Sequence, residues 1–203
     1  MFILDYSVGE NAKNFRPLIE LSETLRIIRQ TPEWRVDPEK IAVCGFSAGG
    51  HLSASLGTMW DDPELKKVYD NQNGANRPNA MILGYPVILA DKFAHEGSIR
   101  NVSGAAPGTP AYEYFSLERH VSEKTCPAFL WHTAADDLVP VENTLKFCLA
   151  LQAKKIPYEV HIFPDGWHGL SACTHETGFA HPHNARWMEL AIDWLDKTFE
   201  FAL

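Results

Sequence analysis

The chain has 203 residues, of which 45% are hydrophobic and 22% are charged, so it has the length of one domain and enough apolar side chains to form a core. It carries 18 basic and 26 acidic residues, a net charge of −8, and no cluster of lysine and arginine. This composition excludes an intrinsically disordered chain, and it leads us to expect neither nucleic acid nor a membrane as a partner.

Cysteine usage and the first residues bear on where the protein resides. The four cysteines are scattered and form no C-x-x-C pair, which indicates reduced thiols rather than a disulfide framework. No apolar stretch reaches the roughly 20 residues that cross a bilayer. Residues 1–4 lack a basic segment and are followed at once by Asp5, unlike a signal peptide. We therefore expect a cytoplasmic protein.

The first half of the chain alternates short apolar runs with stretches of helical periodicity. Residues 2–6 are apolar and predict a strand, and residues 17–30 carry leucine and isoleucine at helical spacing. Residues 41–45 predict a second strand, followed directly by a helix over residues 48–59. Residues 61–78 are polar and rich in turn-forming residues.

The same alternation continues in the second half, after an irregular segment. Residues 86–125 show no clear period and mix glycine, proline, histidine and aromatic residues. The predicted strands are residues 80–85, 128–132 and 158–163, and the predicted helices are residues 141–153 and 184–199.

Apolar strands separated by amphipathic helices are typical of a parallel sheet with helices on both faces. The sequence therefore predicts an α/β fold with a mostly parallel sheet, built as a single domain over residues 1–203, with residues 86–125 as a cap-like insertion. The carboxyl ends of parallel strands share one edge, and ligands of such folds bind there. We expect the functional residues at that edge.

Residues 41–52 read IAVCGFSAGGHL and hold the first candidate functional residue. Ser47 stands between Gly45 and Gly49 as G-x-S-x-G, the nucleophile-elbow pattern, between a predicted strand and a predicted helix. Glycine permits a tight turn that lifts the hydroxyl clear of the sheet, and the following helix N-terminus favours developing negative charge. The pattern predicts Ser47 as a nucleophile and the Ala48 N–H as an oxyanion donor; the alternative is a serine that merely caps a helix.

A serine nucleophile needs a base, because its hydroxyl is weakly nucleophilic at neutral pH. Asp136 and Asp137 follow the predicted strand 128–132, and His168 follows the predicted strand 158–163. The order Ser, Asp, His, each just past a strand, matches the α/β-hydrolase triad. Singly, the aspartate could shape a turn and the histidine could lie on the surface, but together they favour a triad. Adjacent residues point apart, so only one aspartate is expected to reach the imidazole.

A second group of polar residues has the composition of a metal site. No pair among them has a standard zinc spacing, and the segment reads as a loop, so we expect no metal and no cofactor. These residues are Cys173, His175, His181 and His183.

Five stretches spanning most of the chain carry a family resemblance. They are FILDYSV (2–8), VDPEKIAVCGFSAGGHLSASL (36–56), NAMILGYPVI (79–88), PAFLWHTAADDLVPVENTLKF (127–147) and IPYEVHIFPDGWHGLS (156–171). The chain resembles the acetyl esterase/lipase branch of the α/β-hydrolases, near the acetyl-xylan-esterase-like proteins. By position, the resemblance makes Ser47 the nucleophile, Asp136 rather than Asp137 the acid, and His168 the base. Thr133 is a departure, since many relatives have glycine there.

The resemblance also implies an N-terminal segment that the sequence does not show. Such proteins carry about three more strands before residues 2–6, one of which leads into a glycine-rich loop that supplies a second oxyanion N–H. No such loop precedes Ser47. We therefore expect an N-terminally truncated sheet whose gap would leave costly unpaired backbone groups. There are two alternatives to a truncated sheet. Residues 2–6 pair directly beside the predicted nucleophile strand, or a partner chain fills the gap, and the second alternative makes a homo-oligomer possible.

The function implied by the resemblance is a serine carboxylesterase. It would release acetate from an acetylated sugar or a similar small ester through an acyl-enzyme. Tyr85 and Trp167 are expected to bind the substrate. The alternatives are a catalytically impaired remnant, because the glycine-rich loop is missing, and a serine peptidase, for which no site for a peptide amine is evident. Further aromatic residues either line the pocket or belong to the core, and the sequence does not choose between the two; they are Phe93, Tyr112, Tyr114 and Phe115.

Overall fold

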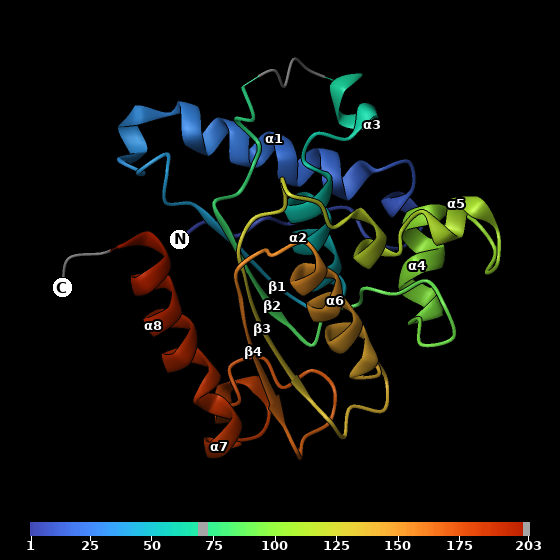
Figure 1. The fold of residues 1–203 in the computed structure, drawn as a ribbon, viewed down its shortest axis with the longest axis vertical. Coiled ribbons are helices and arrows are strands. Elements are labelled where there is room, and N and C mark those ends of the chain that lie inside the picture. Colours follow the sequence, from blue (N-terminus) through green and yellow to red (C-terminus); the bar gives the residue numbers. More distant parts are fainter. Residues whose placement is uncertain (69–72, 201–203) are drawn as a thin grey trace.

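The computed structural model describes residues 1–68 and 73–200, and its centre is a parallel sheet (Figure 1). The strands are β1 (Ala42–Phe46), β2 (Ala80–Gly84), β3 (Ala128–Thr133) and β4 (Tyr158–Phe163), in that order across the sheet. Each neighbouring pair is parallel, so the carboxyl ends of these strands meet at one edge. The predicted parallel α/β sheet is confirmed.

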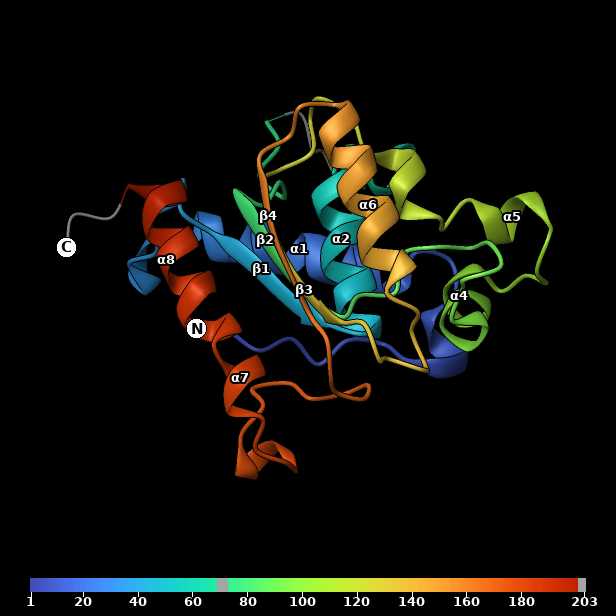
Figure 2. The same cartoon turned by 60° about the horizontal axis from the view of Figure 1, so that its bottom comes forward.

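Helices cover both faces of the sheet (Figures 1 and 2). On one face, α2 (Ala48–Met59) packs against β1 and β2, and α6 (Glu142–Ala153) packs against β3 and β4. Helix α1 (Arg16–Gln30) packs on α2, while α8 (Trp187–Phe199) lies on the opposite face against β3. This arrangement buries both faces of the central strands.

Side-chain alternation along the strands builds two cores. Met81 and Leu83 of β2 pack in the core on the α2 side, and Ile82 between them packs in the core on the α8 side. On that second side, the Trp131 ring of β3 stacks on Trp187 with ring centroids 5.2 Å apart. Because β2 and β3 are apolar on both faces, their sequences read as continuous hydrophobic runs rather than as an alternating pattern.

The predicted strand over residues 2–6 is wrong. Residues 1–8 have no regular secondary structure. A strand gains its stability from cross-strand partners, and this segment instead meets helices. The backbone N–H and the hydroxyl of Ser7 donate to Glu20 of α1, at 2.8 and 2.7 Å, and the Phe2 ring packs on Trp34.

The expectation that front strands are missing from the sheet is not borne out. The four described strands form one sheet in sequence order, with no gap between neighbours. The alternative, in which residues 2–6 pair beside β1, is also not what the structure shows, since residues 1–8 form no strand and β2 is the one strand paired with β1 in the described sheet.

Residues 86–125 hold short helices that the sequence pattern does not predict. They are α4 (Glu96–Ser103), α5 (Pro110–Glu113) and a 3₁₀ turn, Leu117–His120. Ile99, Tyr112 and Phe115 form a small separate core with neighbours outside the segment. Its cap function stays a prediction.

Other differences from the predicted elements are small. The predicted helix 184–199 is divided into α7 (Pro182–Ala185) and α8, and residues 69–72 of the predicted turn-rich stretch lie outside the described residues. The remaining elements are α3 (Pro63–Lys66) and 3₁₀ turns at Gly9–Ala12, Pro32–Trp34 and His175–Thr177. In the part of the chain that the structure describes, no helix is long and apolar enough to cross a bilayer.

Candidate active site

Ser47 lies at a sharp turn between β1 and α2. Its φ of 53° and ψ of −117° are a strained combination for a residue with a side chain. Gly45 makes the turn possible, because a Cβ there would come within 2.0 Å of the Gly49 carbonyl oxygen. A Cβ on Gly50 would come within 2.8 Å of the Pro86 Cβ. The glycines thus let α2 start close behind the strand, and the serine is held at the carboxyl edge of the sheet.

The structure brings the three predicted triad residues together. The Ser47 hydroxyl lies 2.8 Å from Nε2 of His168, and Nδ1 of the same ring lies 2.7 Å from Oδ2 of Asp136. With the ring proton on Nδ1, Nδ1–H donates to the carboxylate and Nε2 is free to accept from the serine. This is the geometry that general-base activation of a hydroxyl requires.

Asp136, and not Asp137, reaches the imidazole. Asp136 is buried, and its Oδ1 accepts from the backbone N–H groups of Leu138 and Val139, at 3.0 and 2.9 Å. Burial alone would raise the pKa of this carboxyl, but hydrogen bonds from His132, His168 and Val139 bring its pKa well below the usual range. Asp137 is exposed. The carboxylate that faces His168 is therefore ionised at neutral pH.

His132 is a buried neighbour of the site that sequence reasoning missed. Its Nε2 lies 2.9 Å from the Val139 carbonyl oxygen and 3.3 Å from Oδ2 of Asp136, and its Nδ1 lies 2.8 Å from the Thr144 hydroxyl. The ring therefore braces the turn that carries the aspartate. A histidine at the end of an otherwise apolar strand was the signal in the sequence.

Tyr85 is a buried neighbour of His168. It is only 4% exposed, its ring lies 4.9 Å from the His168 ring, and its hydroxyl accepts from the Ser171 N–H at 2.9 Å. Burial raises its pKa to about 12, so the phenol stays neutral. Its φ of 36° is a left-handed value at the end of β2. These contacts fix the imidazole and the loop behind it.

Trp167 differs from Tyr85 because it is 47% exposed beside His168. Its ring packs edge-to-face with Phe179 and His181, with centroids 4.9 and 5.0 Å away. Phe179 is 63% exposed as well. An exposed aromatic pair therefore lies next to His168.

The other aromatic residues considered for the pocket divide by location. Tyr112 is buried in the small core of residues 86–125, and Phe93 packs against the ammonium groups of lysines. Tyr114 donates its hydroxyl to Asp62 at 2.5 Å. Only Phe115 lines the cavity beside Ala48.

Cys173 and the histidines near it, which have the composition of a metal site, are not placed to bind one ion together. Within residues 1–68 and 73–200, no three His, Cys, Asp or Glu side chains are placed to hold a metal ion. His181 and His183 pack instead against the rings of Trp167 and Phe163.

Comparisons with known proteins extend this picture. The profile of the prolyl oligopeptidase family matches residues 25–201. The chain is 40% identical over 180 residues to endo-1,4-beta-xylanase B of Butyrivibrio fibrisolvens and 30% identical over 175 residues to an acetylxylan esterase of Xylanibacter ruminicola. Those alignments cover 86% and 83% of this chain, which spans 28% and 34% of the two relatives.

A solved structure matches nearly the whole chain. It is an acetyl ester-xyloside bifunctional hydrolase from Caldicellulosiruptor lactoaceticus, which superposes with a TM-score of 0.84 at 36% identity. The match covers 99% of this chain and 72% of that one. The similarity therefore includes all four strands and the loops that carry Ser47, Asp136 and His168.

Proposed function

This chain belongs to the prolyl oligopeptidase family, and on that premise we propose that it is a serine carboxylesterase that hydrolyses short-chain, acetyl-type esters of carbohydrates. The observation that carries the proposal is the hydrogen-bonded series from Ser47 through His168 to Asp136. The fold that carries these three residues is shared with a hydrolase of acetyl esters. The resemblance to the acetyl esterase branch agrees with the relatives that the chain matches.

In the proposed reaction, His168 takes the hydroxyl proton as the Ser47 oxygen attacks the acyl carbon. Asp136 stabilises the imidazolium, and its low pKa keeps it ionised throughout. The C–O bond to the alcohol breaks, and His168 returns the proton to the leaving alkoxide. Water, deprotonated by the same ring, then cleaves the acyl-enzyme and releases the acid and the serine.

Negative charge on the carbonyl oxygen needs hydrogen-bond donors. As the first residue of α2, Ala48 has an N–H without an intrahelical partner, next to the nucleophile and at the positive end of the helix. We propose it as one oxyanion donor. Losing a single such donor costs roughly 10²–10³ in rate.

A carbohydrate as the alcohol is supported by the exposed aromatic residues beside the base. The alkoxide must leave next to His168, and Trp167 directly precedes that residue and is exposed to solvent. A flat, partly exposed aromatic ring suits the C–H face of a sugar. Two matched proteins are named for xylan or acetylxylan, which agrees with this choice. Tyr85 would act by holding His168 rather than by touching the sugar.

A serine peptidase is the second candidate, since the matched family takes its name from an oligopeptidase. The same triad can cleave an amide, so the geometry of Ser47, His168 and Asp136 does not by itself distinguish the two reactions. The test is a substrate pair: an ester and a peptide p-nitroanilide at equal concentration. We expect the ester alone to be cleaved.

The experiment that tests the proposal is hydrolysis of p-nitrophenyl acetate by the purified chain and by Ser47→Ala. We expect turnover that is lost in the variant, with Ser103→Ala on α4 as a matched control that keeps it. Mass spectrometry after a serine-directed phosphonofluoridate should place one adduct on Ser47. Equal rates for the wild type and Ser47→Ala would overturn the proposal and favour an impaired remnant of an esterase.

A further inference from the structure

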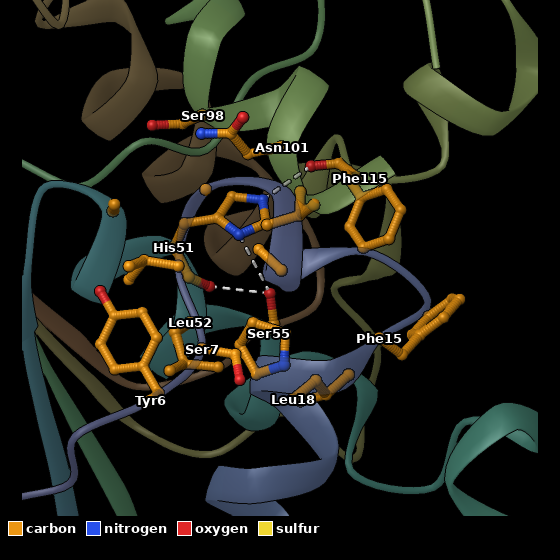
Figure 3. A pocket seen from close by; sticks show the side chains of 16 residues that line it. Tyr6, Ser7, Phe15, Leu18, His51, Leu52, Ser55, Ser98, Asn101 and Phe115 are labelled. Atoms are coloured by element: carbon orange, nitrogen blue, oxygen red, sulfur yellow. Dashed lines mark hydrogen bonds between the residues drawn. The ribbon is translucent and has the colours of Figure 1, made fainter. Parts of the chain in front are cut away.

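Two of the described histidines are buried, and one of them touches the triad. His51 is 4% exposed, and its ring faces the Phe115 carbonyl oxygen and the Ser55 hydroxyl (Figure 3). His132 is 0% exposed and lies at the end of β3, just before the loop that carries Asp136. The proposed reaction uses neither ring. A buried polar ring costs free energy unless its nitrogens have partners, so the partners of His132 indicate what it does.

Both ring nitrogens of His132 are paired within the protein. Nδ1 lies 2.8 Å from the hydroxyl of Thr144, which is itself buried on α6. Nε2 lies 2.9 Å from the carbonyl oxygen of Val139. A carbonyl oxygen only accepts, so Nε2 carries a hydrogen and donates it to Val139. The ring is therefore fixed in one orientation between a strand and a helix.

The bond to Val139 connects His132 to the carboxylate of the triad. The backbone N–H of Val139 donates to Oδ1 of Asp136 at 2.9 Å, and its carbonyl oxygen accepts from His132. Nε2 of His132 also lies 3.3 Å from Oδ2 of Asp136. Oδ2 is the atom that His168 contacts through Nδ1, at 2.7 Å. One buried ring thus contacts both the residue that holds Oδ1 and the oxygen that faces the base.

We propose that His132 is a positioning residue for the ester hydrolysis, which anchors the turn 136–139 so that Oδ2 of Asp136 stays directed at His168. The proposal rests on the esterase function above and adds a residue that does not touch the substrate. The bond to Val139 is the shorter of the two contacts of Nε2, so anchoring outweighs the sharing of charge on Oδ2. Loss of the ring should therefore loosen the contact between Asp136 and His168.

The other titratable groups around His168 stay neutral at the pH values where the triad works. The Tyr85 ring lies 4.9 Å from His168 at the end of β2, and burial raises its pKa to about 12. The thiols of Cys44 and Cys173 interact electrostatically with Tyr85, and burial raises the pKa of each to about 11. Asp136 is thus the charged group in contact with the ring. A change in pH dependence therefore reports the contact between Asp136 and His168.

The test compares two substitutions at one position, with p-nitrophenyl acetate as the substrate. His132→Leu fills the space without a donor, whereas His132→Gln keeps an amide N–H that can reach the position of Nε2. We expect kcat to fall about tenfold to a hundredfold in His132→Leu with KM unchanged, because small misplacements of a catalytic group cost this much. His132→Gln should restore kcat to within a few-fold of wild type. A ring that only fills space would make leucine the better replacement, and that order would overturn the proposal.

The pH dependence of kcat/KM separates positioning from a general loss of stability. A loosened Asp136 stabilises the protonated His168 ring less, so the ring loses its proton at lower pH. The acid limb of the profile should move to lower pH by about 0.5 unit in His132→Leu, a part of the roughly 1–3 units that an opposite charge supplies at contact. Leu130→Val removes a buried methylene from the same face of β3 and should leave kcat and the acid limb unchanged. An acid limb that stays in place or moves to higher pH in His132→Leu overturns the proposal.

A readout without substrate keeps the proposal separate from the esterase function. The Nδ1 proton that His168 donates to Asp136 should give a far-downfield proton NMR signal, assigned by its loss in His168→Ala. We expect this signal to move upfield or disappear in His132→Leu and to persist in His132→Gln and Leu130→Val. An unchanged signal in His132→Leu overturns the positioning role. If the wild type cleaves no ester, the esterase function falls, and the signal alone decides whether His132 holds Asp136.

Circular dichroism shows whether each variant folds. If His132→Leu does not fold, Thr144→Val takes its place, because it removes the partner of Nδ1 and keeps the ring. It should lower kcat and move the acid limb in the same direction as His132→Leu. Wild-type values for both quantities in Thr144→Val would then overturn the proposal.

Discussion

At the residue scale, the choice between two adjacent aspartates is the sharpest prediction. Asp136→Asn should lower kcat by about 10⁴, because an amide in place of the carboxylate favours the wrong imidazole tautomer and no longer stabilises the imidazolium. Asp137→Asn is the matched control and should keep wild-type activity, since its side chain faces solvent. The measurement is ester hydrolysis, with circular dichroism to show that both variants fold. Comparable losses in both variants would contradict the assignment.

The low pKa of Asp136 also has a consequence for stability. The pKa of an unfolded aspartate is about 3.9, and the pKa of Asp136 in the folded chain lies below that value. The stabilisation from its ionised form is thus complete above about pH 4 and is lost as the pH falls through the folded pKa. We expect the difference in unfolding free energy between wild type and Asp136→Asn to be larger at pH 6 than at pH 3. Urea denaturation at the two pH values measures it; a difference independent of pH would argue against an ionised, stabilising carboxylate.

At the element scale, the two glycines of the G-x-S-x-G pattern are not equivalent. A Cβ on Gly45 would lie 2.0 Å from a backbone oxygen, whereas a Cβ on Gly49 would meet nothing closer than the Tyr6 hydroxyl at 3.5 Å. Gly45→Ala should therefore cost about 3 kcal/mol or more, since backbone must move. Gly49→Ala should be neutral or up to about 1 kcal/mol stabilising, because alanine is the better helix former. Thermal or urea unfolding compares the pair, and equal destabilisation would show that the turn does not pack as described.

At the scale of the whole molecule, the buried side chain of Asn143 joins the segment 86–125 to helix α6. The side-chain oxygen Oδ1 of Asn143 accepts from the backbone N–H groups of Ile88 and Leu89, both at 2.9 Å. Its side-chain nitrogen Nδ2 donates to the backbone carbonyl oxygens of Phe93 and Pro140. Asn143→Ala would leave two buried donors unpaired at about 1–3 kcal/mol each. We expect a loss of about 2–5 kcal/mol in urea unfolding, against little change for the exposed Gln152→Ala on the same helix. A loss below 1 kcal/mol would mean that water replaces those bonds.

The sequence by itself determined the elements whose information is local. The four described strands and the helices α1, α2 and α6 follow from runs and periodicities within a single segment. The order of Ser47, Asp136 and His168 at strand ends was likewise readable, because parallel strands bring their carboxyl ends to one edge whatever the loops do.

The tertiary structure alone decided everything that depends on contacts between distant segments. Residues 2–6 have the composition of a strand but lack a neighbour to pair with, so they pack on helices instead. Helices α4 and α5 are too short to be stable alone and owe their form to packing, which leaves no period to read. The residues around Asp136 and Asp137 do not by themselves choose between the two; the resemblance favoured Asp136, and the hydrogen bond to His168, 32 residues away, is the contact that distinguishes it. The cavity beside Ala48 exists only because residues 6–18, α2, α4 and Phe115 come together around it, and no one of these segments encodes it alone.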